Sequence, residues 1–169
     1  MVYANKQKIR KKRFTQMSKP FQICATLPAL MPHCTKWERW DGKTWIFASA
    51  MAVEIIRKDV RYSMIVSPGF TTDGGSIPRV FWRVAGHPLG DWLLAYLAHD
   101  AFYASEYLPR SMADEIFLEI LCWLSAPRLI RNAAWGAVRG GGLAVWKQHT
   151  EETVTAARAL IHMDIERLT

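Results

Sequence analysis

The chain has 169 residues, of which half are hydrophobic and eight are tryptophan. It is therefore long enough to bury a core, and its composition excludes a disordered chain. No uninterrupted run of about 20 apolar residues occurs, which argues against a transmembrane segment. The three cysteines lack metal-ligand spacing and favour free thiols in a reducing compartment.

The formal net charge of +7 is concentrated at the N-terminus. Residues 1–19 contain seven of the 22 Lys and Arg residues and no acid, so the other 15 basic residues balance the 15 acids. We expect a basic arm over 1–19 and a single domain over 20–169. Such an arm could bind other proteins, nucleic acid or an anionic membrane surface, or could simply be a solvated tail. Prolines follow it instead of an apolar segment, so no secretory signal is predicted.

The first half of the domain has strand patterns. Three prolines keep residues 20–36 extended. An Asp41-Gly42 turn between aromatic flanks predicts a Trp-rich hairpin. The β-branched runs 51–57 and 60–66 predict a second strand pair. Together these segments predict a small antiparallel sheet of three to five strands.

The second half begins with a turn-rich loop over 67–78 and is helical after it. We expect helices over 79–85, 91–104, 111–126 and 128–146, followed by a last amphipathic helix. Asp91 is the expected N-cap of the second helix and Thr150 that of the last, while Ser111 is expected to cap the third helix with Asp114 at its third helical position. The fourth helix is expected to be broken by the glycines at 140–142. The glycines favour close helix packing or a kink over a phosphate loop. The predicted fold class is α+β, with the helical half packed on the small sheet.

A set of polar residues on an apolar helix gives the clearest chemical signal. His99 and Tyr103 are four residues apart and share a face, whereas Asp100 is turned about 100° away. A short connection brings Asp114 beside His99, where it could orient the ring of a general base. Asp100 and Asp73 could bind a hard cation such as calcium, with loop carbonyls as further ligands. The alternative is a buried structural network in which Asp114 only caps its helix.

Three motifs carry a resemblance to a known family. In order, they are Thr-Asp-Gly-Gly-Ser-Ile-Pro at 72–78, His-Asp-Ala-Phe-Tyr at 99–103 and Ala-Asp-Glu-Ile-Phe at 113–117. The set resembles a family of small proteins of unknown function encoded by tailed bacteriophages and prophages, the domain-of-unknown-function family numbered thirteen fifty-three. The similarity covers roughly residues 60–125. It implies a phage protein that is present in the host cytoplasm during assembly and could be incorporated in the virion.

The second and third motifs are also similar to those of secretory and parvoviral phospholipases. That resemblance implies that His99 is the general base for water, Asp100 a calcium ligand, Asp114 the residue that orients His99, and Tyr103 a second donor to Asp114. The flanking cysteines of the secreted enzymes are absent here, and a calcium loop is recognisable only if residues 68–76 replace it.

The sequence thus predicts a calcium-assisted hydrolase that acts on lipid esters or cell-envelope material through His99. The alternative is a non-enzymatic virion or assembly protein, of the tail or capsid, that docks on phage or host proteins through its basic arm and Trp-rich hairpin. A third hypothesis is an inhibitor of a host protein.

Overall fold

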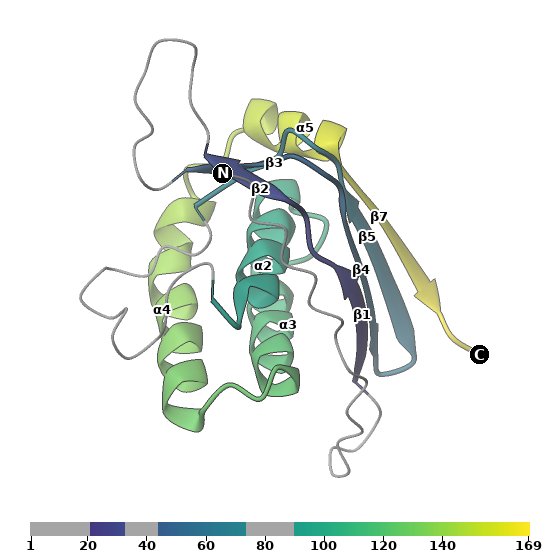
Figure 1. The fold of residues 1–169 in the computed structure, drawn as a ribbon, viewed down its shortest axis with the longest axis vertical. Coiled ribbons are helices and arrows are strands. Elements are labelled where there is room, and N and C mark those ends of the chain that lie inside the picture. The colour runs from purple at the N-terminus through teal and green to yellow at the C-terminus, as the bar shows by residue number, and fades with distance from the viewer. Residues whose placement is uncertain (1–20, 33–43, 74–89) are drawn as a thin grey trace. The chain divides into compact units, whose positions relative to one another are not determined.

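The computed structural model describes residues 21–32, 44–73 and 90–169 (Figure 1). The predicted basic arm 1–19, the turn of the Trp-rich hairpin, the helix 79–85 and residues 74–78 of the turn-rich loop lie outside the described residues. Two compact units are present. The first contains the described residues up to Thr71 together with 162–169, and the second is Thr72–Ile161. The single domain over 20–169 stays a prediction.

The predicted α+β class is confirmed, because strands fill the N-terminal half and helices most of the C-terminal half. The strands are β1 (Gln22–Thr26), β2 (Leu30–Pro32), β3 (Trp45–Phe47), β4 (Met51–Arg57), β5 (Val60–Val66), β6 (Thr71–Thr72) and β7 (Ile161–Arg167). The helices are α2 (Leu93–Ser105), α3 (Arg110–Trp123), α4 (Arg128–Trp146) and α5 (Glu151–Leu160). One sheet has the strand order β1-β4-β5-β7, and a second sheet has the order β2-β3-β6.

The hairpin of β4 and β5 has the bounds predicted from the sequence. Its buried residues alternate along β4 and pair across the strands as Met51 with Val66, Val53 with Met64 and Ile55 with Tyr62. Lys58 and Asp59 connect the strands, with positive φ values of 51° and 65°. A two-residue loop of this conformation matches the twist of paired strands. Because one face is buried, a slip of one residue would expose the whole apolar set.

Strand β7 was not predicted, since the C-terminal half was expected to be helical to its end. It follows α5 directly and lies next to β5 in the sheet (Figure 1). Its first five residues alternate between apolar and polar, a pattern typical of a strand. Arg61 on β5 donates to Glu166 at 2.7 Å, and the Leu168 amide donates to the Asp59 carbonyl at 2.7 Å. The C-terminal segment therefore completes the sheet instead of extending a helix.

Helices α2 and α3 form the antiparallel pair that the short connection predicted (Figure 1). The ring centroids of Tyr96 on α2 and Phe117 on α3 are 5.4 Å apart. His99 lies three residues after Tyr96, and it contacts Asp114, which lies three residues before Phe117. Contacts that move in opposite directions along two helices define an antiparallel register. This register places the polar residues of α2 against one acid of α3.

Two predicted helix caps are wrong. Residues 91 and 92 form a turn, so α2 begins at Leu93 and Asp91 does not cap it. Helix α3 begins at Arg110, directly after Pro109, and Ser111 therefore lies inside the first turn. A proline supplies no backbone N–H donor and is tolerated where a helix starts. Because α3 starts earlier than expected, Asp114 lies beyond the cap and its side chain faces the interior.

The predicted break of α4 at its glycines is also wrong, because the helix is continuous from Arg128 to Trp146. Gly142 is the buried position in α4, and a Cβ atom there would lie 2.5 Å from the Tyr103 hydroxyl oxygen. Gly140 and Gly141 have open space around the corresponding positions. Close helix packing is thus the structural role of Gly142.

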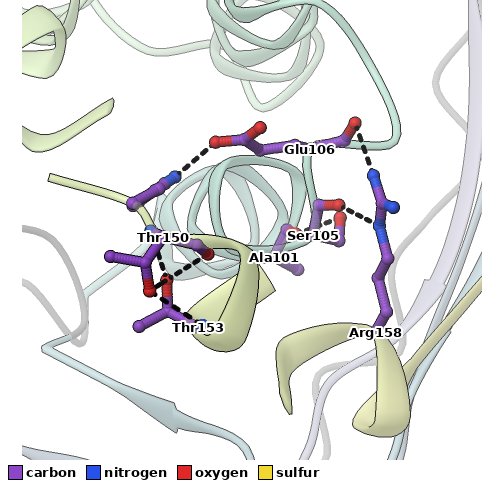
Figure 2. Close-up of polar contacts among 7 residues, drawn as sticks. Ala101, Ser105, Glu106, Thr150, Thr153 and Arg158 are labelled. Atoms are coloured by element: carbon purple, nitrogen blue, oxygen red, sulfur yellow. Dashed lines mark hydrogen bonds and ion pairs between the residues drawn. The ribbon is translucent and has the colours of Figure 1, made fainter. Parts of the chain in front are cut away.

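Helix α5 is capped as predicted and is bonded to the end of α2 (Figure 2). The Thr150 hydroxyl accepts from the Thr153 amide at 3.2 Å, and the Thr150 amide donates to the Thr153 hydroxyl at 2.9 Å. Arg158 donates to the Ser105 carbonyl at 2.7 Å and to the Glu106 carbonyl at 3.3 Å. The last carbonyls of a helix lack partners within it. Arg158 therefore stabilises the C-terminal end of α2.

Candidate active site

Asp114 is the centre of the candidate site. Its side chain is fully buried, and its Oδ1 atom is bonded to two residues of α2. His99 Nε2 lies 3.0 Å from Oδ1, and the Tyr103 hydroxyl donates to the same atom at 2.6 Å. His99 and Tyr103 are one helical turn apart, so both reach Asp114 from the same face of α2. The structure therefore brings together the three residues that the sequence predicted as catalytic.

Two arginines occupy the other oxygen of Asp114. Arg110 Nη1 lies 3.4 Å and Arg139 Nη1 3.3 Å from Oδ2. Arg110 also donates to the carbonyl of Arg139 at 3.1 Å. Neither arginine was predicted from the sequence as a site residue. Arg110 could have been found from its position four residues before Asp114 on the same helix, whereas Arg139 is brought in by α4 and has no local signal.

The contacts of Asp114 determine its charge. Burial raises the pKa of Asp114, but hydrogen bonds from His99 and Tyr103 and the positive charge of Arg110 outweigh burial and hold the pKa below its ordinary value. Asp114 is therefore ionised at neutral pH. Burial and the bond to Asp114 raise the pKa of Tyr103 to about 12, so Tyr103 stays a protonated donor.

The ionised carboxylate also determines which nitrogen of His99 carries the proton. A carboxylate only accepts hydrogen bonds, so Nε2 must donate, and the neutral ring then has its lone pair on Nδ1. The ring of His99 lies against Tyr103, with centroids 4.1 Å apart, and against Phe117 at 5.0 Å. These contacts hold the imidazole in one orientation, with Nδ1 as the nitrogen that can take up a proton.

Helix α4 covers the other side of Tyr103. Trp146 packs edge-on against the Tyr103 ring at 5.1 Å, and Gly142 lies against its hydroxyl. Neither residue was predicted as part of the site. Because Gly142 has no side chain, Tyr103 has enough room to reach Asp114, which explains why a glycine lies inside this helix.

The two residues predicted to bind a metal, Asp100 and Asp73, interact electrostatically. The Thr72 hydroxyl donates to Asp100 Oδ2 at 2.5 Å. Burial, with the negative charge of Asp73 as a second cause, raises the pKa of Asp100 to about 7, although the bond from Thr72 opposes this. A bound cation would relieve the repulsion between the two carboxylates. Calcium requires about six to eight oxygen ligands, so two carboxylates alone do not make a calcium site.

The described part of the chain contains no group of three or more His, Cys, Asp or Glu residues arranged to hold a metal ion. The loop carbonyls of Gly74 and Gly75, which were predicted as further ligands, lie outside the described residues. Asp100 and Asp73 therefore stay predicted ligands.

These observations define a small α+β protein with a buried His-Asp-Tyr cluster that three helices hold together. The sequence profile of the family described as "Protein of unknown function (DUF1353)" matches residues 47–138. This match covers more than half of the chain, which therefore belongs to that family, as its motifs predicted. The matched region includes His99, Tyr103 and Asp114 and ends one residue before Arg139.

Searches of curated proteins and of solved structures found no match. Among residues 21–32, 44–73 and 90–169, none of the helices combines the length and the apolar character needed to cross a membrane.

Proposed function

We propose that this protein is a hydrolase in which His99 activates water, with lipid esters or cell-envelope material as its substrate. The main support is the contact of His99 Nε2 with a buried carboxylate at 3.0 Å. This contact leaves Nδ1 with a lone pair and orients it, which is what a general base requires.

The proton transfers of the proposed reaction use groups of this chain. Nδ1 of His99 takes a proton from water while the water oxygen attacks the ester carbonyl carbon. Asp114 stabilises the imidazolium that forms, and Tyr103 holds Asp114 in place through its bond to Oδ1. When the tetrahedral intermediate collapses, His99 returns the proton to the leaving oxygen, which gives an acid and an alcohol.

Calcium is a second part of the proposal, with Asp100 and Asp73 as its ligands. A calcium ion would polarise the ester carbonyl and stabilise negative charge on its oxygen. The support is that burial and the negative charge of Asp73 raise the pKa of Asp100, and a bound cation would offset the negative charge.

The test of the proposed base is His99→Asn, assayed for hydrolysis of phospholipid vesicles and of peptidoglycan. Asparagine can still donate to Asp114, so the variant should fold, while hydrolysis should fall by about a hundredfold or more. His162→Asn is the matched control, because the side chain of His162 is 72% exposed and bonds only to Asp164 among the described residues. Equal hydrolysis by wild type and His99→Asn, or no hydrolysis by the wild type, would refute the proposal.

The calcium part has its own test. Added calcium should raise the melting temperature of the wild type through binding linkage and leave that of Asp100→Asn unchanged. Magnesium serves as the comparison ion. An equal shift in both proteins, or no shift in the wild type, contradicts a calcium site at Asp100.

A non-enzymatic virion or assembly protein is the second candidate. The observation that favours it is that both oxygens of Asp114 are occupied by side chains from three helices. Such a carboxylate can serve to hold helices together. For this candidate, His99→Asn lowers stability, and the wild type hydrolyses neither substrate and does not respond to calcium.

A further inference from the structure

The charges of the Asp114 cluster do not balance. Among the described residues, Arg110 and Arg139 are two cations that contact one anion, Asp114, and the protonated Tyr103 adds no charge. The described part of the cluster therefore has a surplus of positive charge. Both ion pairs are long, at 3.4 and 3.3 Å, so neither guanidinium is tightly bound to the carboxylate.

The surplus charge lies on the accessible side of the cluster. The side chain of Asp114 is fully buried, whereas that of Arg110 is 22% exposed and that of Arg139 is 39% exposed. A guanidinium has five N–H donors in a planar fork. Within the described part of the chain, both guanidiniums contact Asp114 through Nη1, and Arg110 also interacts with the Tyr103 hydroxyl. Because both side chains are partly exposed, part of each guanidinium is open to solvent.

Two further contacts prepare this position for an anion. Arg139 lies over the ring of Trp135, with Cζ 5.8 Å from the ring centroid, which limits the orientations of its guanidinium. Arg110 is the first residue of the 14-residue helix α3, so the positive end of the helix dipole adds to its charge.

We infer that Arg110 and Arg139 form a binding subsite for a phosphoryl group. The oxygens of a phosphoryl group can accept from two guanidinium forks at once. The subsite itself is independent of the proposed hydrolysis. Its link to catalysis rests on the proposed function and narrows the substrate class to an ester that carries a phosphate, with the phosphate on the arginines and the ester carbonyl near His99.

The experiment titrates the full-length protein with inorganic phosphate at constant ionic strength, by calorimetry. Arg139→Gln should weaken phosphate binding by about tenfold or more, since it removes a charge-assisted contact. Arg131→Gln removes the same charge from the same helix and should leave binding nearly unchanged. Because the basic residues 1–19 also attract phosphate, the comparison between these two variants is the readout.

Arg139→Lys keeps the charge and loses the fork, so it should fold and bind phosphate more weakly than the wild type. Arg110→Gln should also weaken phosphate binding, as an independent test of the second arginine. Equal phosphate affinity of the wild type, Arg139→Gln and Arg139→Lys would overturn the inference, as would equal losses in Arg139→Gln and Arg131→Gln.

His99→Asn separates this inference from the proposed function. The variant should bind phosphate like the wild type, since His99 is not in the subsite. Phosphate binding that depends on Arg139, in a protein that hydrolyses no ester, would leave the subsite standing and refute the hydrolase. Hydrolysis that depends on His99, with equal rates on neutral and phosphate-bearing esters, would refute the link between the subsite and catalysis, while the phosphate titration decides on the subsite itself.

Discussion

Replacing Asp114 by alanine should be among the most destabilising substitutions in the helical unit. The change removes the acceptor of two buried donors, because His99 and Tyr103 are only 7% and 6% exposed. Each buried donor left without a partner costs about 1–3 kcal/mol, so the pair predicts a loss of about 2–6 kcal/mol. Arg110 and Arg139 are partly exposed and can be hydrated instead, so they add little to this figure.

Asp114→Asn should have a smaller effect. Its Oδ1 can still accept from His99 and Tyr103, but its amide nitrogen then faces the two guanidiniums, which are donors as well. The loss of the charge-assisted contacts predicts about 1.5–3 kcal/mol. Asp164→Ala, at an acid whose side chain is 75% exposed, is the control and should change the free energy of unfolding by less than about 0.5 kcal/mol.

Urea unfolding at several pH values measures these differences. The folded pKa of Asp114 is below its ordinary value of 3.8, so its ionisation contributes stability above that pH, and the contribution is lost as the pH falls through the folded pKa. The difference between wild type and Asp114→Asn should therefore narrow in acid. A loss below about 1 kcal/mol for Asp114→Ala, or a difference that does not depend on pH, would refute the network.

Two further predictions test the packing and the charge of the site. Gly142→Ala should destabilise by about 1–3 kcal/mol, because the new methyl group would lie 2.5 Å from the Tyr103 hydroxyl. Gly140→Ala adds the same group in open space and should stabilise by about 0.5–1 kcal/mol. Asp100→Asn should raise the melting temperature at pH 8 and leave it unchanged near pH 3. The folded pKa of Asp100 is raised from 3.8 to about 7, so stability present below 3.8 is lost as the pH rises through about 7.

The controls for these two predictions are internal. Urea unfolding of both alanine variants separates the clash from helix propensity, and equal effects at 140 and 142 would contradict close packing of α4 on Tyr103. For Asp100→Asn, the free energy of unfolding at pH 8 should exceed that of the wild type by at most about 4 kcal/mol, the free-energy equivalent of the pKa shift of Asp100. A variant that is less stable than the wild type at pH 8 would show that ionised Asp100 is favourable.

The parts that local pattern determines were predictable. Strands β4 and β5 have one buried and one exposed face, so their alternation fixes both bounds and register. The contact of His99 with Asp114 followed from helix spacing and a short connection, since two helices joined by a few residues must lie side by side. The start of α3 was predicted one residue too late, because Ser111 is a residue type common at helix caps. The helix instead begins at Arg110, directly after Pro109.

The parts that tertiary structure determines were not predictable in the same way. Residues 161–167 follow an amphipathic helix without a Gly or Pro between them, so no stop signal separates their alternating pattern from the helix. They become a strand because β5 offers an open edge. Arg139 likewise lies 25 residues from Asp114 in sequence, and only the packing of α4 against α3 brings them together.

The position of Asp114 shows how one carboxylate can serve stability and chemistry together. Its two oxygens are divided, with His99 and Tyr103 on Oδ1 and the two arginines on Oδ2. An isolated buried charge would be too costly, so the arginines stabilise its ionised form. An ionised Asp114 in turn fixes the tautomer of His99 without further groups. The arginines therefore act on the orientation of His99 through Asp114, even though neither is bonded to His99.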